Sequence, residues 1–223
     1  MKKYSLLFIF IVASAGAQGT QSGQYPALSA YMMSRDAEVA LARSAAPSNV
    51  SDRATIKVLT QSGYDVVRQG ENGFVCMVMR GWSAPTYTPE QFRDLVYDPS
   101  VRAPICFDPA AVRTVMPYYE MRSKLAMEGN TSDRIVARIE AAYARGELPP
   151  RDGVSFAYMW SAEQHLGPGI GHWHPHMMVF APYYRNAMLG DHEFGKPLPV
   201  VSDDGGTPFA VVVIPVDDKL AIT

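Results

Sequence analysis

The sequence predicts an α+β fold, with a mostly antiparallel sheet of about five strands and helices packed on one face of the sheet. Helix-capping residues precede apolar residues at helical spacing, and short apolar runs are separated by Gly and Pro. The predicted helices come before and between the predicted strands, an arrangement that suits a layer of helices on a mostly antiparallel sheet. The 223 residues, 48% hydrophobic and 19% charged, exclude a disordered or collagen-like chain.

The first 17 residues have the layout of a bacterial secretory signal peptide. Lys2 and Lys3 precede an apolar run at residues 6–13, and small residues at 15–17 form an A-x-A cleavage site before Gln18. We therefore expect a periplasmic or secreted protein. No later apolar stretch reaches the roughly 20 residues that a membrane-spanning helix needs, so no span is expected after cleavage.

Beyond the cleavage site, the composition predicts one folded unit. Residues 18–28 are rich in Gly, Gln, Ser and Thr and are expected to form a flexible arm, and residues 29–223 a single α+β domain. The 20 Lys and Arg residues against 22 Asp and Glu residues give a net charge of −2. This balance lacks the basic surface of a nucleic-acid-binding protein, so no nucleic-acid partner is expected. The sequence does not indicate a protein partner.

Two helix signals lie in the first third of the mature chain. Ser34 is an N-cap residue before acidic residues and a short Ala-rich segment, which predicts a helix. Ser51 is a second candidate cap, and it predicts a helix over residues 52–60 that packs Ile56 and Leu59 into the core.

Two more helices are expected in the middle of the chain. Asp108 and Pro109 supply a cap and a first-turn proline, and Pro117 should kink or split the helix that follows before it ends at Gly129. The next helix carries one apolar stripe and ends at Gly146.

The strongest turn signal is the Asn72-Gly73 pair, because both residues tolerate the positive φ angles of a tight hairpin turn. It predicts that residues 64–69 and 74–80 pair as a hairpin. Further strands are predicted at residues 154–160, 176–181 and 209–216.

The two cysteines, Cys76 and Cys106, are expected to form a disulfide, because an oxidising compartment preserves such bonds. Closing a loop of about 30 residues would stabilise the fold by roughly 3.5 kcal/mol in the chain-entropy model. The alternative is a cysteine nucleophile partnered by a histidine. No C-x-x-C motif supports that alternative.

All five histidines of the chain lie within one short stretch, and this concentration is the most unusual feature of the sequence. They are His165, His172, His174, His176 and His192. In the run from His172 to His176, histidines alternate with Trp173 and Pro175. On an extended chain the alternating imidazoles point to one side, and Pro175 favours an extended conformation at His174.

Imidazole is a common ligand for zinc and copper, so the histidines predict a divalent transition-metal site. Residues rise about 3.3 Å each along a strand, which separates His172 and His176 by roughly 13 Å, whereas zinc–nitrogen bonds are about 2.0–2.1 Å. Two neighbours such as His172 and His174 could share one metal. The third ligand would be His165, His192, Glu163 or Asp191, with Trp173 beside the ligand.

We therefore hypothesise an exported metal- or small-ligand-binding module built on the histidine-rich strand. One alternative is a periplasmic enzyme with a histidine-based or metal-assisted hydrolytic site, although the G-x-S-x-G and H-E-x-x-H motifs are absent and no catalytic residue can be assigned. Another is a structural or partner-binding domain without a site, in which the histidines are solvated at a sheet edge.

Overall fold

The structure is a computed structural model that describes residues 27–83, 98–166, 171–193, 196–201 and 205–223. The predicted signal peptide and its cleavage site lie outside the described residues, as does most of the predicted arm. The first described element is a short 3₁₀ helix, η1 (Leu28–Tyr31).

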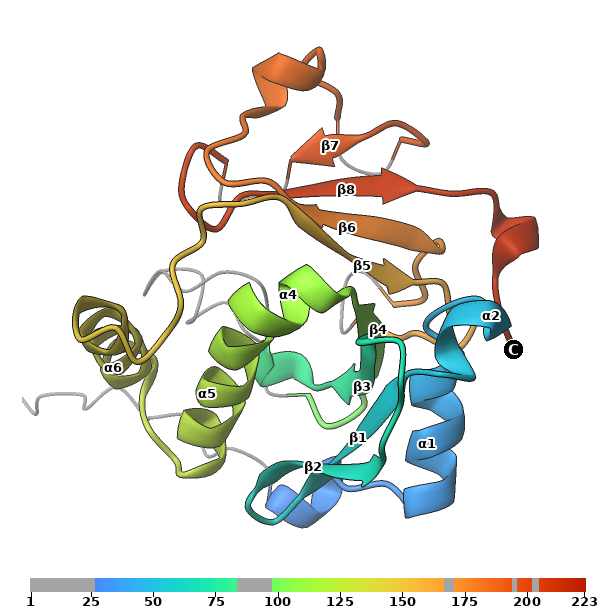
Figure 1. Cartoon of the computed structure of the whole chain (residues 1–223), viewed down its shortest axis with the longest axis vertical. Coiled ribbons are helices and arrows are strands. Elements are labelled where there is room, and N and C mark those ends of the chain that lie inside the picture. Colours follow the sequence, from blue (N-terminus) through green and yellow to red (C-terminus); the bar gives the residue numbers. More distant parts are fainter. Residues whose placement is uncertain (1–26, 84–97, 167–170, 194–195, 202–204) are drawn as a thin grey trace, which may run out of the picture.

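The described strands form one mixed sheet of eight strands in the order β2-β1-β3-β4-β5-β6-β8-β7 (Figure 1). β1 and β3 run parallel, and all other neighbouring strands run antiparallel. The strands are β1 (Thr55–Thr60), β2 (Gly63–Arg68), β3 (Val75–Met79), β4 (Ala103–Phe107), β5 (Ser155–Met159), β6 (His176–Phe180), β7 (Val200–Val201) and β8 (Val211–Pro215).

The α+β class is confirmed, but the expected number of strands is too low. The five expected strands correspond to β2, β3, β5, β6 and β8, and the structure adds β1, β4 and β7. β1 was expected to be helical, and β7 has only two residues. The sheet is therefore larger than expected, and it is mixed.

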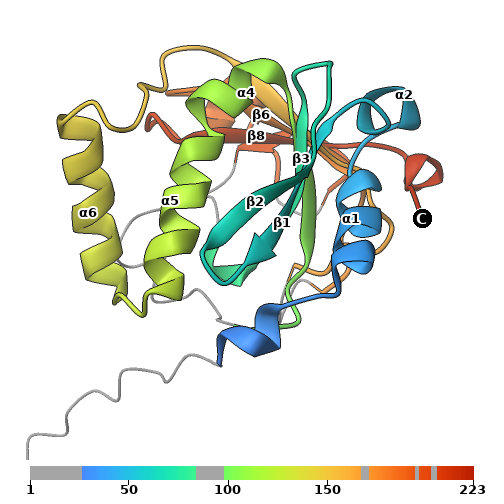
Figure 2. The same cartoon turned by 60° about the horizontal axis from the view of Figure 1, so that its bottom comes forward.

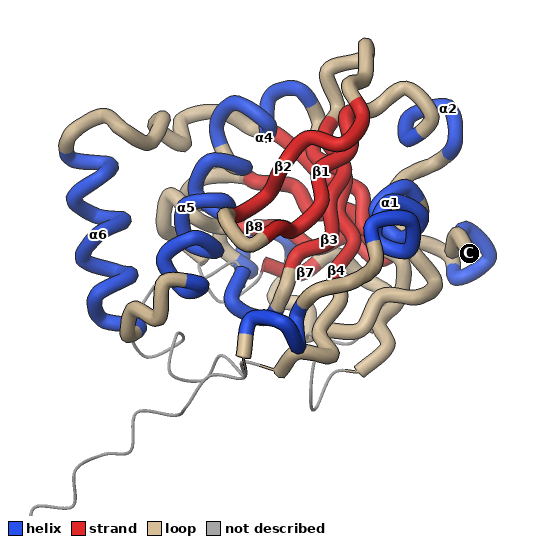
Figure 3. Tube along the Cα trace, turned by 90° about the horizontal axis from the view of Figure 1, so that it is seen from below, coloured by secondary structure: helices blue, strands red, loops and turns tan. Residues whose placement is uncertain are grey.

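Helices cover both faces of the sheet, whereas the sequence predicted cover on one face (Figures 2 and 3). One face carries α4 (Pro109–Thr114), α5 (Met116–Met127) and α6 (Ser132–Ala144), and the other carries α1 (Arg35–Arg43) with the short α2 (Ser48–Ser51). In the described part of the chain, no helix combines the length and apolar character needed to cross a membrane.

The predicted helix boundaries near Ser34, Asp108 and Pro117 are confirmed. The Ser34 side chain accepts a hydrogen bond from the backbone N–H of Ala37 at the start of α1. Asp108 Oδ1 accepts one from Ala111 N at 2.8 Å at the start of α4. Pro117 lies in the first turn of α5, so the expected single helix is split in two, since proline has no N–H to donate and its ring favours a first-turn position.

The helix expected over residues 52–60 is wrong, because Thr55–Thr60 form β1. Ile56, Val58 and Leu59 are all buried, since helices cover both sides of this strand. A strand that is buried on both faces loses the alternation of apolar and polar residues that would have identified it.

The hairpin expected around Asn72-Gly73 is also wrong. β2 pairs with β1 through a tight turn in which Thr60 lies opposite Gly63, and β3 lies on the other side of β1. The connection from β2 to β3 therefore crosses one strand. Asn72 and Gly73 still form a local turn, in which Asn72 Oδ1 accepts from Phe74 N and Gly73 has a φ of 78°.

β3 lies at the centre of the packing. Its residues Val75, Met77 and Met79 face the core under α4, α5 and α6, whereas Cys76 and Val78 face the Ala-rich side of α1. All five side chains are buried. β3 therefore links the two hydrophobic layers of the molecule.

Candidate functional site

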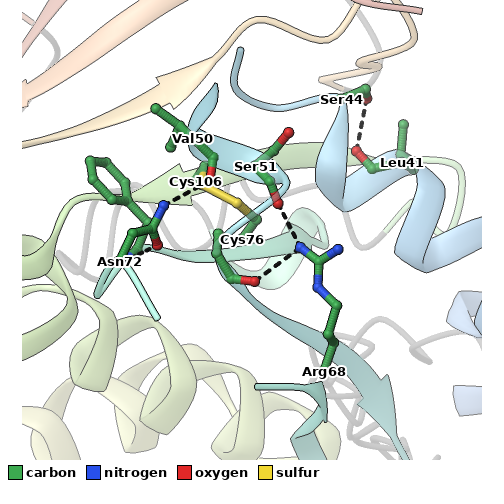
Figure 4. Close-up of a disulfide and its surroundings, with 10 residues drawn as sticks. Leu41, Ser44, Val50, Ser51, Arg68, Asn72, Cys76 and Cys106 are labelled. Atoms are coloured by element: carbon green, nitrogen blue, oxygen red, sulfur yellow. Dashed lines mark hydrogen bonds between the residues drawn. A yellow bond between two sulfur atoms is a disulfide. The ribbon is translucent and has the colours of Figure 1, made fainter. Parts of the chain in front are cut away.

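Cys76 and Cys106 form a disulfide, as the sequence predicts (Figure 4). They lie directly opposite each other on the antiparallel strands β3 and β4, and both are fully buried. Nearby, Asn72 Nδ2 donates to Val50 O at 2.8 Å and Arg68 Nη2 donates to Ser51 O at 2.5 Å. These two hydrogen bonds hold α2 beside the disulfide. Because both sulfurs are in this bond, the alternative of a cysteine nucleophile does not apply to this structure.

The five histidines occupy three different places in the fold. His165 and His172 pair with each other before β6. His174 lies two residues before β6, and His176 is the first residue of β6. His192 lies in the connection between β6 and β7. The histidines therefore do not all converge on one point, as the sequence had suggested.

His165 and His172 lie directly opposite each other in an isolated antiparallel bridge. Leu166 N donates to Gly171 O at 2.8 Å, so the pair is of the type whose two members exchange no hydrogen bond. Such pairs have Cα atoms about 4.5 Å apart and side chains on the same face. His172 is exposed and His165 is half-buried, which leaves the pair open to solvent.

On the opposite edge of its segment, the backbone of His165 pairs with the backbone of Arg102. Each residue donates its N–H to the carbonyl oxygen of the other at 2.8 Å. His165 is therefore held between two neighbouring segments. Its Nδ1 atom is buried and makes no hydrogen bond, so Nε2 is the nitrogen that His165 can offer to a ligand.

In the other four histidines, Nδ1 faces an oxygen that can only accept a hydrogen bond. Nδ1 therefore carries the proton, and in the neutral ring Nε2 carries the lone pair. The acceptors are Gln164 O for His172 at 3.2 Å, Asp218 Oδ1 for His174 at 2.6 Å, His174 O for His176 at 2.8 Å, and Pro199 O for His192 at 2.9 Å.

His176 is a buried, neutral residue of the core. Its side chain lies on the same face of β6 as Met178 and Phe180, and it is 4% exposed. Burial lowers the pKa of His176 to about 4, although the hydrogen bond to His174 O opposes this shift. The ring therefore carries no charge at neutral pH.

His174 is exposed and bound to a residue that the sequence did not identify, Asp218 in the 3₁₀ helix η4 (Asp218–Leu220). The C-terminal segment is also fixed by its backbone. Val216 N donates to Pro175 O at 2.9 Å, and Ile222 N donates to Trp160 O at 2.8 Å. The carboxylate thus orients the imidazole so that Nε2 points away from it.

Among the described residues, His192 forms hydrogen bonds with its own connection and not with the other histidines. Its ring donates to Pro199 O, and its carbonyl accepts from Asn186 Nδ2 at 2.7 Å. Asn186 Oδ1 in turn accepts from Val201 N. These bonds tie the β6–β7 connection to the edge strand β7.

The structure places the other predicted ligand residues apart. Glu163 is exposed in the turn after β5, and Asp191 is exposed with a left-handed φ of 55° in the β6–β7 connection. The Trp173 ring contacts the His174 ring with 5.8 Å between centroids. Among the residues that the structure describes, no group of three or more His, Cys, Asp or Glu side chains is arranged to hold a metal ion.

Gln164 positions the histidine segment and was not identified from the sequence. Its side chain is buried, and Nε2 donates to Trp173 O at 3.0 Å and to His174 O at 3.1 Å. Its own backbone carbonyl accepts from His172. A single glutamine gives no motif that would have revealed this role.

The chain matches no protein-family model, no curated protein and no solved structure. A functional proposal for this chain therefore depends on its own residues and their geometry.

Proposed function

We propose that this chain is an exported α+β protein that binds a divalent transition metal, with zinc or copper as the ion, through His165 and His172. The observation that supports the proposal is the direct cross-strand pairing of these two residues. Side chains opposite each other on antiparallel segments are close enough for two imidazoles to bind one ion.

The hydrogen bond from His172 Nδ1 to Gln164 O supports the same role. Histidine ligands commonly donate their second ring nitrogen to a carbonyl or carboxylate, which fixes the ring and makes the ligating nitrogen more basic. Two imidazoles fill only part of the tetrahedral coordination that zinc prefers. The remaining positions would hold water or a small ligand from solution.

Export is the second part of the proposal. It is supported by the basic, apolar and small-residue segments of residues 1–17 and by the Cys76–Cys106 disulfide. Structural disulfides are typical of proteins outside the reducing cytosol.

The metal proposal is tested by titrating untagged, metal-free protein with Zn²⁺ and with Cu²⁺ in a calorimeter. We expect one equivalent of metal to bind. His172→Gln should weaken the affinity at least about 10-fold, the scale of losing a supporting interaction of a ligand. His174→Gln is the matched control, because His174 is a similarly exposed histidine that is bound to Asp218 instead.

Absence of metal binding by the wild-type protein would rule out the proposal. Equal losses in the two variants would show that His172 and His174 share the ion, which would also contradict the assignment to His165 and His172.

A second candidate function is acid–base catalysis by His174, the hydrolytic alternative considered above. The observation that favours it is the 2.6 Å contact between His174 Nδ1 and Asp218 Oδ1, which orients an exposed imidazole as a general base requires. A panel of activated esters would test it. Turnover by the wild-type protein that is lost in His174→Gln and kept in His172→Gln would support catalysis, and no turnover above the buffer rate would reject it.

A further inference from the structure

Arg102 lies beside the proposed metal site, on the same face as its two histidines. Arg102 and His165 exchange both of their backbone hydrogen bonds at 2.8 Å, so they lie directly opposite each other on antiparallel segments. His172 lies opposite His165 on the other side. Side chains of directly opposed residues share a face, with about 4.5–5.5 Å between the paired Cα atoms. Arg102, His165 and His172 therefore form one row of side chains across three neighbouring segments.

The guanidinium group of Arg102 has one edge that is available to a ligand. Nη1 donates to Pro99 O and, at 2.8 Å, to Val101 O. Nε and Nη2 form no hydrogen bond with any residue that the structure describes, and neither atom is buried. The N–H groups of these two atoms point in nearly the same direction and match two oxygens of one anion. Because this edge reaches solvent, an anion can bind to it without a movement of the fold.

The positive charge of Arg102 is only partly compensated by the described residues. Burial and the neighbouring charge of Arg80 lower the pKa of Arg102, and the carboxylates of Glu38 and Asp98 oppose this shift. Glu38 pairs with Arg80 instead, and Asp98 Oδ1 accepts from Ser100 N at 2.7 Å. Neither carboxylate forms an ion pair with Arg102. An anion at the available edge of Arg102 would therefore add an attraction that these residues do not supply.

A divalent ion at His165 and His172 would add positive charge to the same row, and it needs further ligands besides the two imidazoles. A carboxylate has only two oxygens, and bidentate binding to Arg102 occupies both of them. A phosphate group has a third oxygen that can bind the ion. We propose that Arg102 and the ion together bind a phosphate group, with two of its oxygens on Arg102 and a third on the ion. This inference rests on the proposed metal site and names its ligand.

Asp98 is the nearby negative charge with which a bound phosphate would interact. Hydrogen bonds from Ser100 lower the pKa of Asp98, and the positive charges of His165 and Arg102 lower it further. The carboxylate of Asp98 is thus close enough to both residues to interact with their charges, but it forms an ion pair with neither. Its charge opposes the binding of a second anion, so Asp98→Asn should strengthen phosphate binding and leave the zinc affinity unchanged.

Calorimetric titration of the zinc-loaded, untagged mature protein with inorganic phosphate tests the site. We expect one equivalent of phosphate to bind, and the metal-free protein should bind it at least about 10-fold more weakly, because one phosphate oxygen loses its partner. Arg102→Lys keeps the charge but removes the two-donor edge, so its phosphate affinity should also fall at least about 10-fold while its zinc affinity stays unchanged. Arg68→Lys is the matched control, because Arg68 is also half-buried and donates to two backbone carbonyls.

Phenyl phosphate distinguishes the two sources of a phosphate group. Similar affinities for phenyl phosphate and inorganic phosphate would support a phosphate ester as the ligand, and binding of inorganic phosphate alone would support the free ion. Acetate is the comparison for a carboxylate, and an affinity for acetate equal to that for phosphate would overturn the assignment to phosphate. A loss of zinc affinity in Asp98→Asn would show that Asp98 occupies the position given to phosphate, and it would overturn the assignment as well.

The side-chain ¹⁵N signal of Arg102 Nε in the zinc-loaded wild-type protein gives a readout that does not depend on a variant. It should move on adding phosphate and stay in place on adding sodium chloride. An unchanged Arg102 signal at saturating phosphate would overturn the inference. Zinc binding without phosphate binding would overturn the phosphate site and leave the proposed function standing, whereas failure to bind zinc would reject both.

Discussion

Glu38 of α1 and Arg80, which follows β3, form an ion pair in the interior, with 2.9 Å between Glu38 Oε2 and Arg80 Nη2. Their side chains are 1% and 0% exposed, respectively. Glu38 Oε1 also accepts from Leu59 N at 3.0 Å, and Arg80 Nε donates to Tyr31 O at 2.9 Å. One pair of charges thus connects α1, η1, β1 and β3.

Glu38→Ala should lower the free energy of unfolding by about 3–5 kcal/mol, because it leaves the Arg80 charge buried without a partner. Equilibrium unfolding in urea measures the loss. Glu71→Ala is the control, since Glu71 pairs with Arg53 on the surface and its removal should change the stability little. A loss below about 1 kcal/mol in Glu38→Ala would contradict this account.

The stability of the protein should fall between about pH 6.5 and pH 4 because of His176. Its folded-state pKa of about 4 lies below the ordinary value of 6.5, so the unfolded chain takes up a proton first as the pH falls. The stabilisation is complete above pH 6.5, and roughly 3 kcal/mol is lost by pH 4. Urea unfolding across this range should show a shallower pH dependence in His176→Gln, and identical slopes would exclude His176 as the cause.

Gly70→Ala should destabilise the fold severely. A Cβ atom at residue 70 would lie 2.3 Å from Ala54 C and 2.3 Å from Thr55 N, which are backbone atoms that cannot move independently. Gly153→Ala is a matched control, because a Cβ atom there meets nothing within 4 Å. We expect Gly70→Ala to unfold at a much lower temperature and Gly153→Ala to stay near the wild-type Tm, as measured by circular dichroism. Similar Tm values for the two variants would show that the close approach at Gly70 is not real.

Replacing both cysteines by alanine should reduce the stability by roughly 3.5 kcal/mol, because the disulfide closes a loop with a sequence separation of 30 residues. Loss of two buried side chains adds to this figure. Thiol titration of the denatured, unreduced protein provides the complementary measurement. It should find no free thiol in the wild type, and two thiols per chain would show that the bond does not form.

The N-terminus of the exported protein should be Gln18. Expressing the full chain in a bacterium and sequencing the N-terminus of the periplasmic or secreted product tests this expectation. Ala17→Leu should slow the cleavage, because the signal requires small residues at this site. Retention of the uncleaved chain in the cytosol would contradict the export proposal.

Local signals in the sequence predicted local structure well. Ser34, Asp108 and Gly129 act at helix ends as expected, because capping depends on a few neighbouring residues. The turn at Asn72-Gly73 forms as well, but which strands flank that turn is decided by pairing across the sheet. β1 lies between β2 and β3, and no local pattern encodes that arrangement.

The spacing of Ile56 and Leu59 shows why one helix prediction was wrong. Two apolar residues three positions apart suit one face of a helix, but they also suit a strand with cover on both sides. The cap signal at Ser51 favoured the helix, and Ser51 does end the short α2. The cover on both sides comes from α1 and α5, whose placement depends on the complete fold.

The surroundings of the five histidines show how far the sequence could anticipate their placement. The alternation predicted that His172, His174 and His176 point to one side, and the structure leaves His172 and His174 exposed but buries His176 in the core, because His176 begins β6. The hydrogen-bond partners could not be predicted. Asp218 is 44 residues from His174 in the sequence, and the bond from His172 depends on the backbone of Gln164.

The Cys76–Cys106 bond also affects how the molecule would respond to a protease. A single cut between Met79 and Ala103 gives two polypeptides that remain covalently joined, with β1 to β3 in one and β4 to β8 in the other. Such a nicked protein would migrate as one species in a non-reducing gel and as two after reduction.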